Sequence, residues 1–307
     1  MDRVVQSSHR YIFFAIIYIT GHLLVFPVCV FSSEDKQIAI VVSKKIRPYM
    51  DVIDGITDGL GEKSKISEVF FLDFDRRNNE KISLKLQNDQ FDLSVAIGPE
   101  ASEFLWTLGT DLNSSFKKIF TAVLDPDNLF KKGTSQCGIS LRIPVDRQVY
   151  EISKLFVNVK RIGLLFDARS NDWFYEKAYL ASKKYDITII PLQIESKSLI
   201  TQVLAENWKN IDFVWMIPDS TVISEKIIQH IIKLGIYHKK GVIGYNSFFI
   251  RSGAFFSFDF DYKTLGIQTA KKIEIYFKTG VCKEEAPEFQ TVINRKMIDK
   301  IGVKVKE

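Results

Sequence analysis

The chain has 307 residues and a mass of 35.3 kDa, and 46% of its residues are hydrophobic while 26% are charged. This balance is typical of a folded protein, so disordered and fibrous chains are excluded, and the length predicts two cores rather than one. The formal net charge is +5, and no segment of the sequence is dominated by lysine or arginine, so we expect no nucleic-acid partner.

The N-terminus predicts export. Two arginines precede an apolar stretch, Tyr11–Phe31, and polar residues begin at Ser32. This order is typical of a secretory signal peptide, with cleavage predicted after Ser32 and a periplasmic mature protein. Two alternatives stay open: the stretch is about long enough to remain as a membrane anchor, and Cys29 offers a site for lipid attachment, although Val28 before it is not the small residue such a site prefers.

The two cysteines of the predicted mature chain, Cys137 and Cys282, lack the spacing of a metal site. We therefore expect no metal. Whether they form a disulfide stays open, because sequence does not give the distance between their Cα atoms. The nucleophile-elbow, dinucleotide, P-loop and HExxH motifs are missing from the sequence, so we expect no cofactor and no enzymatic activity.

From Gln37 onward, short apolar runs alternate with stretches of helical period, which predicts βαβ units and a parallel sheet. The predicted strands are Gln37–Val42, Glu68–Asp73, Asp92–Ile97, Lys118–Leu124, Arg161–Phe166, Thr188–Ile194, Asp212–Ile217 and Val242–Tyr245. Helices are predicted to start at four places, namely Pro48, Pro99, Asn171 or Asp172, and Asp219–Thr221.

The second set of strands repeats the first at an offset of about 120 residues, so the chain is predicted to hold two copies of one α/β lobe. Further extended segments near Leu141, Phe258 and Thr291 predict three crossings between the lobes, and a first-lobe helix over Tyr262–Thr279. The expected fold class is α/β, with two doubly wound parallel-sheet lobes joined by a three-strand hinge. The expected domains are a signal peptide over 1–32, a first lobe over 33–142 and 259–290, and a second lobe over 143–258 and 291–307.

Ligands of open parallel sheets bind beyond the carboxyl ends of the strands. The loops there supply polar groups from both predicted lobes, which we expect to face one another across a cleft and to bind a small molecule: Ser43, Gly98, Glu100, Asp125, Asp167, Asp219, Tyr245 and Asn246. Helix N-termini favour an anionic group of the ligand, whereas the aspartates favour a cationic one. Asp219 is the strongest single candidate to bind a cationic group of the ligand. The alternative is that it only caps a helix.

The ordered motifs FDLSVAIGPEA, KKIFTAVLDP, GISLRIPVDRQ, DFVWMIPDST and RSGAFFSFDFDYKTLGIQTA resemble the ABC-transporter substrate-binding proteins of the type I periplasmic binding fold, whose named members bind tryptophan or other aromatic amino acids. The resemblance spans roughly Ile38 to Val303. It implies a receptor that closes two lobes over a small ligand and delivers it to a membrane permease. We expect the protein to be a monomer. Pro99 departs from the family pattern, because a hydroxyl residue is common there and proline lacks a backbone N–H for a carboxylate.

The function expected from the sequence is therefore an extracytoplasmic solute-binding protein for an ABC transporter permease, with an amino acid as one candidate ligand. A ligand-sensing subunit for a membrane sensor kinase is the alternative, because the same fold serves both roles and only the partner differs.

Overall fold

A computed structural model describes residues 35–302 and 304–305, apart from 74–75, 89–90, 112–116, 131–135 and 158. The predicted signal peptide, its cleavage site and Cys29 lie outside these residues. None of the helices in this described part of the chain is long and apolar enough to cross a membrane.

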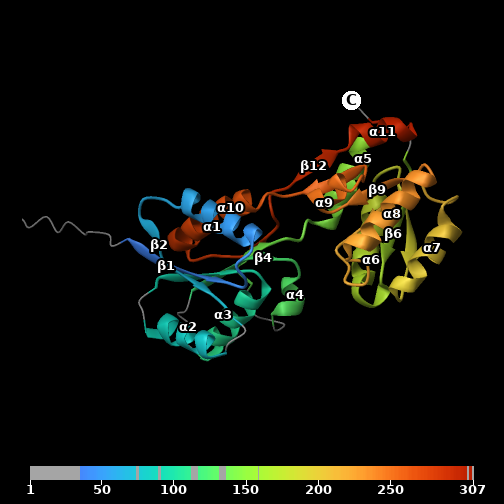
Figure 1. The fold of residues 1–307 in the computed structure, drawn as a ribbon. Helices are drawn as coiled ribbons and strands as arrows, with labels where there is room; N and C mark the ends of the chain where they lie inside the picture. Colours follow the sequence, from blue (N-terminus) through green and yellow to red (C-terminus); the bar gives the residue numbers. More distant parts are fainter. Residues whose placement is uncertain are drawn as a thin grey trace, which may run out of the picture. The chain divides into compact units, whose positions relative to one another are not determined.

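The first sheet, which contains the strands labelled β1, β2 and β4 in Figure 1, has six strands, all parallel, in the order β11-β5-β4-β3-β1-β2. Its strands are β1 (Lys36–Val42), β2 (Ser64–Phe71), β3 (Leu93–Ile97), β4 (Lys118–Val123), β5 (Gly138–Ser140) and β11 (Glu284–Glu285). The four predicted strands of this lobe are present. The second of them begins four residues earlier than predicted and ends before Asp73. Ser64 to Ile66 also pair with β1, and the register shift that skips Ser67 is not visible in a pattern of alternating residues.

The second sheet also has six strands, in the order β12-β10-β9-β8-β6-β7, and β12 alone runs antiparallel to its neighbour. The strands are β6 (Arg161–Phe166), β7 (Thr188–Gln193), β8 (Phe213–Met216), β9 (Gly241–Gly244), β10 (Phe256–Asp259) and β12 (Gln290–Ile293). Together the two sheets confirm the predicted fold class. We call each sheet with the helices packed on it a lobe.

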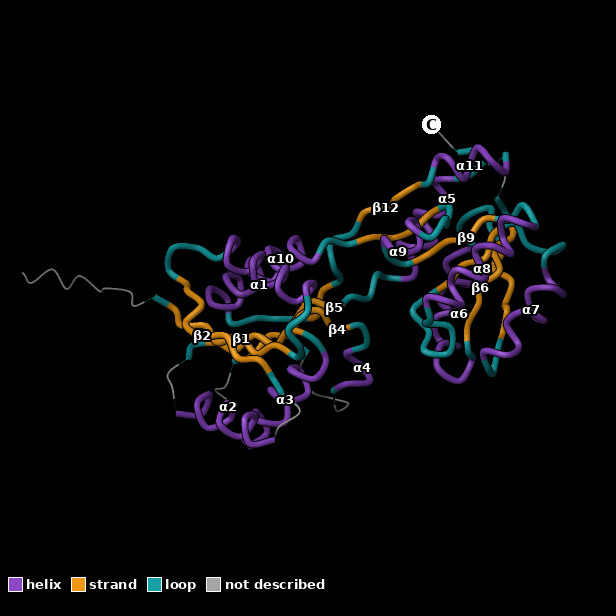
Figure 2. Tube along the Cα trace, in the orientation of Figure 1, coloured by secondary structure: helices purple, strands orange, loops and turns teal. Residues whose placement is uncertain are grey.

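Helices cover both faces of each sheet, as the purple segments in Figure 2 show. They are α1 (Arg47–Gly59), α2 (Arg76–Asn88), α3 (Pro99–Asp111), α4 (Pro126–Leu129), α5 (Val145–Leu155), α6 (Ala168–Ser182), α7 (Ile200–Asn207), α8 (Glu225–Tyr237), α9 (Ser247–Arg251), α10 (Tyr262–Thr279) and α11 (Arg295–Ile301), with a short 3₁₀ helix at Lys197–Leu199.

The alternation along β1 explains the layers of the first lobe. Ile38, Ile40 and Val42 point to a core built with α1 and α10, whereas Ala39 and Val41 point to a second core built with α2 and α3. Figure 1 shows α1 and α10 on one face of this sheet and α2 and α3 on the other. All five side chains are fully buried, as expected for a central strand of a parallel sheet covered on both faces. The second lobe is built in the same way around β6, with α5 and α6 on one face and α7 and α8 on the other.

The chain passes between the two sheets three times, through residues 141–144, 260–261 and 286–289. The third passage lies a few residues before Thr291, because two residues of the preceding segment, Glu284 and Glu285, first pair with β5 in the first sheet. The helix predicted over Tyr262–Thr279 is α10, which packs closely against α1. The residue boundaries assigned to the lobes from sequence stay a prediction.

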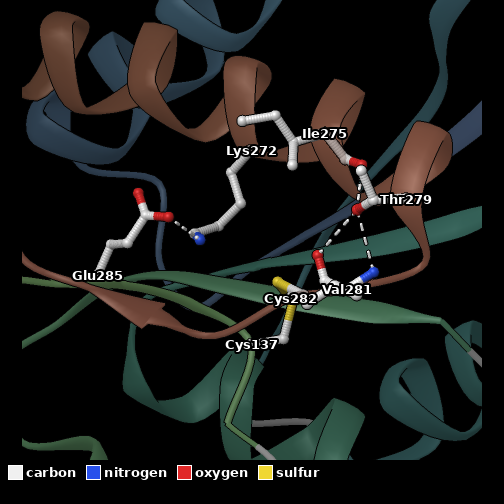
Figure 3. The surroundings of a disulfide bond; sticks show 7 residues. All are labelled: Cys137, Lys272, Ile275, Thr279, Val281, Cys282 and Glu285. Atoms are coloured by element: carbon white, nitrogen blue, oxygen red, sulfur yellow. Dashed lines mark hydrogen bonds and ion pairs between the residues drawn. A yellow bond between two sulfur atoms is a disulfide. The ribbon is translucent and has the colours of Figure 1, made fainter.

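A disulfide joins Cys137, directly before β5, to Cys282, between α10 and β11 (Figure 3). The Cα atoms of the two cysteines are 5.2 Å apart. Beside it, Lys272 of α10, whose side chain is 6% exposed, pairs with Glu285 of β11 at 2.6 Å. The sequence left open whether these cysteines form a disulfide. The pairing of β5 with β11 brings them, 145 positions apart in sequence, to one edge of the sheet, where they do.

Candidate functional site

The carboxyl end of the first sheet brings Ser43, Gly98 and Glu100 together. Ser43 follows β1 and is buried, and its Oγ accepts a hydrogen bond from the N–H of Ala101 at 2.9 Å. Ser43 therefore caps α3, and its N–H also donates to the carbonyl of Ile97. These bonds fix the loop after β1 against the loop after β3.

Gly98 is required at its position. Its φ is +90°, and a Cβ added there would lie 2.7 Å from both Ser43 Oγ and Tyr49 Oη. Burial raises the pKa of Tyr49 to about 12, with the negative charge of Glu100 as a second cause. The close approach of these groups leaves no room for a side chain at residue 98.

We expect Gly98→Ala to lower the free energy of unfolding by about 3 kcal/mol, because about 1–2 kcal/mol of backbone strain adds to the cost of overpacking. Gly280→Ala is the matched control: Gly280 also has a positive φ, +68°, but an added Cβ there meets nothing within 4 Å. Urea unfolding of both variants measures the difference. Equal costs would show that crowding by Ser43 and Tyr49 contributes nothing.

A cavity of about 560 Å³ opens at this end of the first sheet, within the size range of small-molecule sites. It is lined by Ser43, Lys44, Lys45, Leu72, Asp73, Asn79, Glu100, Glu103, Phe104 and Thr107. Lys44 and Glu100 form an ion pair at 2.6 Å. Burial, the largest single effect, would raise the pKa of Glu100, but the hydrogen bond and charge of Lys44, together with hydrogen bonds from Ser43 and the backbone, outweigh it and hold that pKa below its usual range. Two of the eight predicted site residues, Ser43 and Glu100, thus line a cavity.

Asp125, which follows β4, forms an ion pair with Arg142. Its Oδ1 accepts from Arg142 Nη2 at 2.7 Å, and Asp127 accepts from Nη1 of the same guanidinium at 2.6 Å. The hydrogen bond from Arg142 is the main cause that lowers the pKa of Asp127. The guanidinium therefore already supplies Asp125 with a cation.

The carboxyl end of the second sheet brings Asp167 and Asp219 together in one network. The N–H of Asp167 donates to Asp219 Oδ2 at 2.8 Å, and Asn171 Nδ2 donates to the same oxygen at 2.8 Å. Thr221 connects the two carboxylates: its N–H donates to Asp219 Oδ1, and its hydroxyl donates to Asp167 Oδ2. Both aspartates are buried.

Asp167 has a counter-ion two residues away. Arg169 Nε and Nη2 donate to its two oxygens at 2.9 and 2.5 Å. The hydrogen bond from Arg169 is the largest cause that drives the pKa of Asp167 far below its usual range, and it outweighs the effect of burial. The carboxylate therefore stays ionised across the physiological range.

The predicted helix starts in this lobe are wrong in two places. The helix expected to begin at Asn171 or Asp172 begins at Ala168 with Asp167 as its cap, and Asn171 forms a kink inside it. The helix expected at Asp219–Thr221 begins only at Glu225. The reason is that Asp219 caps a turn instead, in which its carbonyl accepts from Val222 and Ile223 and its carboxylate from Thr221.

We expect Asp219→Asn to lower the free energy of unfolding by about 2 kcal/mol. Both carboxylate oxygens accept hydrogen bonds, so an asparagine amide must turn its NH₂ toward a donor at one of them. Urea unfolding at neutral pH measures the loss. A cost below about 0.5 kcal/mol would mean that asparagine serves as well, as at an ordinary cap.

Tyr245 and Asn246 follow β9. Tyr245 packs against Phe249 with ring centroids 4.7 Å apart, and burial, with the charge of Asp219 as a second cause, raises its pKa to about 12. The side chain of Asn246 accepts from the N–H of Phe248 and caps α9. The side chain of Asn246 is therefore occupied by a hydrogen bond within its own lobe, while Tyr245 lies close enough to Asp219 for that charge to affect its pKa.

The eight predicted residues thus gather at the carboxyl ends of their own sheets. The predicted site residues do not include Arg169, Thr221 and Tyr49, which lie beside them. Arg169 and Thr221 each stand two residues after a predicted aspartate, and this spacing is the signal that could have identified them. No comparable signal marks Tyr49, which lies within a helix.

A family model for the ABC transporter substrate binding protein matches residues 37–307. No curated protein matches the chain. The resemblance predicted from the motifs is confirmed by the family match.

Several solved structures share the fold. An ABC domain in complex with L-Trp from Streptococcus pneumonia is 22% identical, with 89% of this chain and 96% of that chain covered and a TM-score of 0.57. The ligand-free, open structure of a substrate binding protein with adhesive properties from Clostridium difficile is 17% identical, with 88% and 95% covered and a TM-score of 0.69. A periplasmic ribose ABC transporter structure from Conexibacter woesei is 10% identical, with 87% and 95% covered and a TM-score of 0.59.

Proposed function

Because the chain belongs to the family of ABC transporter substrate-binding proteins, we propose that it is an extracytoplasmic receptor that delivers a small ligand to an ABC transporter permease. The family consists of solute-binding proteins and is not a class of enzymes. The observation that supports the proposal best is the pair of parallel-sheet lobes, linked by three passages of the chain, with polar side chains gathered at both carboxyl ends. We take the periplasm as its location and the monomer as its active form.

The proposed ligand site lies between the lobes, with Ser43, Gly98, Glu100 and Asp125 on one side and Asp167, Asp219, Tyr245 and Asn246 on the other. Three connecting segments let two rigid lobes rotate while each keeps its own core, which is the usual hinge motion of two-lobed receptors. Ligand then binds both lobes only in the closed form, and the permease recognises that form. Structures of the same fold contain L-Trp and D-arabinose, so amino acids and pentoses are the first compounds to test.

Binding and closure test this proposal. The mature chain from Ser33 is screened by thermal shift against the twenty L-amino acids, D-ribose and D-arabinose, and the best compound is studied by calorimetry and small-angle X-ray scattering. A ligand at a hundred times its dissociation constant stabilises the protein by about 2.7 kcal/mol, and closure lowers the radius of gyration. A compound that binds without any change in the radius of gyration would contradict closure.

Delivery and export need separate readouts. The liganded protein should stimulate ATP hydrolysis by its permease and ATPase in proteoliposomes more than the free protein does. The intact mass of the protein from the periplasmic fraction should correspond to a start near Ser33. A retained leader or a lipid on Cys29 would replace the soluble periplasmic receptor by an anchored one.

A further inference from the structure

The two buried carboxylates of the second lobe are used within that lobe. The carboxylate oxygens of Asp167 accept four hydrogen bonds, three from Arg169 and one from Thr221. The carboxylate of Asp219, a residue that is 1% exposed, accepts three hydrogen bonds, all from uncharged N–H groups. A ligand ammonium has no direct access to either carboxylate.

The helix N-termini beside the predicted site are closed as well. In α3, Pro99 has no N–H, and the N–H groups of Ala101 and Ser102 donate to Ser43 Oγ and to the carbonyl of Gly98. In α6, the first-turn N–H groups of residues 169–171 all donate to Asp167. An anionic ligand group therefore finds few free backbone donors at these two helices.

Arg169 is different, because it is held in place and still accessible. Two of its nitrogens bind the carboxylate of Asp167, and Nη2 also donates to the carbonyl of Glu195 at 2.6 Å. Its side chain is 68% exposed, whereas that of Asp167 is 4% exposed. Nη1 donates to no residue in the part of the chain that the structure describes, so its two N–H groups are available to a ligand.

We propose that Arg169 is the charged residue of the second lobe that contacts the ligand, and that it determines specificity for a ligand with a carboxylate group. This inference rests on the proposed receptor function and assigns Asp219 a different role, that of positioning the loop around Asp167. Asp167 positions Arg169 through its two hydrogen bonds to the guanidinium. A guanidinium that is already held in this way loses little conformational freedom when it binds the carboxylate of a ligand.

The charges around Arg169 favour a carboxylate over a phosphate. Asp167 and Asp219 together exceed the guanidinium by one negative charge, and Glu195 adds its own field. A dianion is repelled more strongly by this surplus than a monoanion is. A carboxylate also matches the planar geometry of a guanidinium.

The test compares acids with their amides. Thermal shift and calorimetry are run with the twenty L-amino acids, the α-amide of each, D-ribose and D-arabinose on the wild type, Arg169→Gln and Arg169→Lys. We expect the wild type to bind an acid at least tenfold more tightly than its amide. In Arg169→Gln the acid binds at least tenfold more weakly and the preference over the amide falls to near one, a loss that a merely structural role would not produce. Arg169→Lys keeps a positive charge near Asp167, so its preference for the acid over the amide should lie between those of the wild type and Arg169→Gln.

Arg161→Gln is the matched control. Arg161 pairs with Asp212 at 2.9 Å at the start of β6, whereas Arg169 lies in α6, just beyond the end of that strand, so this variant loses an ion pair away from the proposed site. Its binding should be unchanged. If an acid binds and Arg169→Gln keeps the preference for it, or if a pentose is the ligand, the assignment of Arg169 is wrong while the receptor function stands. If no compound stabilises the wild type, the receptor function itself fails for these ligand classes, and the assignment fails with it.

Discussion

Replacing both Cys137 and Cys282 by alanine is expected to lower the free energy of unfolding by about 5 kcal/mol. The disulfide closes a loop across a sequence separation of 145 residues, and the loss of this cross-link frees the unfolded chain by an amount that grows with the logarithm of loop length. Both cysteines lie against the same core of the first lobe, so the change also removes packed sulfur atoms. Urea unfolding, monitored by circular dichroism, measures the difference.

Reduction gives an independent control for this prediction. The wild type with a thiol reductant should lose most of this stability but unfold at a slightly higher urea concentration than the double alanine variant, because it keeps the packed sulfur atoms. The reductant should leave the variant unchanged. A loss below about 1 kcal/mol would show that the Lys272–Glu285 pair and the strand pairing of β5 with β11 hold this edge without the cross-link.

Gly55→Ala is expected to cost at least about 3 kcal/mol, at the upper end for overpacking. A Cβ added to Gly55 in α1 would lie 2.0 Å from the carbonyl oxygen of Lys263 and 2.9 Å from the Cα of Gly266, both in α10. These atoms belong to the backbone, so a side-chain rotation does not relieve the clash, and the two helices must move apart. Thermal and urea unfolding measure the cost.

Gly61→Ala is the matched control for the helix contact. Gly61 lies two residues after the end of α1, and an added Cβ there would meet the Glu274 side chain at 3.6 Å, an ordinary contact. The change should cost less than about 0.5 kcal/mol. Equal costs at the two glycines would mean that α1 and α10 pack less tightly than these distances indicate.

The regular part of the fold could be predicted because burial leaves a pattern in the residues. Arg161–Phe166 is a strand with the bounds expected from its apolar run, and all of its residues but the first are buried. The strand Glu284–Glu285 could not be found in this way, because two glutamates have no apolar pattern and their pairing with β5 depends on the chain returning to the first sheet. Pattern reasoning finds strands that fill a core, and misses short ones that only extend an edge.

The candidate site was predictable in its location and less so in its contacts. Asp167 and Asp219 stand where strands end, and the structure places both there. Whether Asp219 starts a helix or caps a turn is not visible in the sequence, because the same short polar side chains serve both purposes. The spacing of two residues makes Arg169 a possible partner of Asp167, but the contact itself depends on the side-chain conformation of Arg169, which the sequence does not determine.

The disulfide also constrains the order in which the chain can mature. The parallel strands of the second sheet, β6 to β10, come from one unbroken stretch of sequence, Arg161–Asp259, that lies wholly inside the loop closed by Cys137 and Cys282. During synthesis from the N-terminus, all five of these strands emerge before Cys282. At that point β1 to β5 have also been made, but α10 and β11, which complete the first lobe, have not. Cys137 can therefore pair with Cys282 only after all five of these strands have emerged, so an oxidising catalyst that acts early meets Cys137 without its native partner.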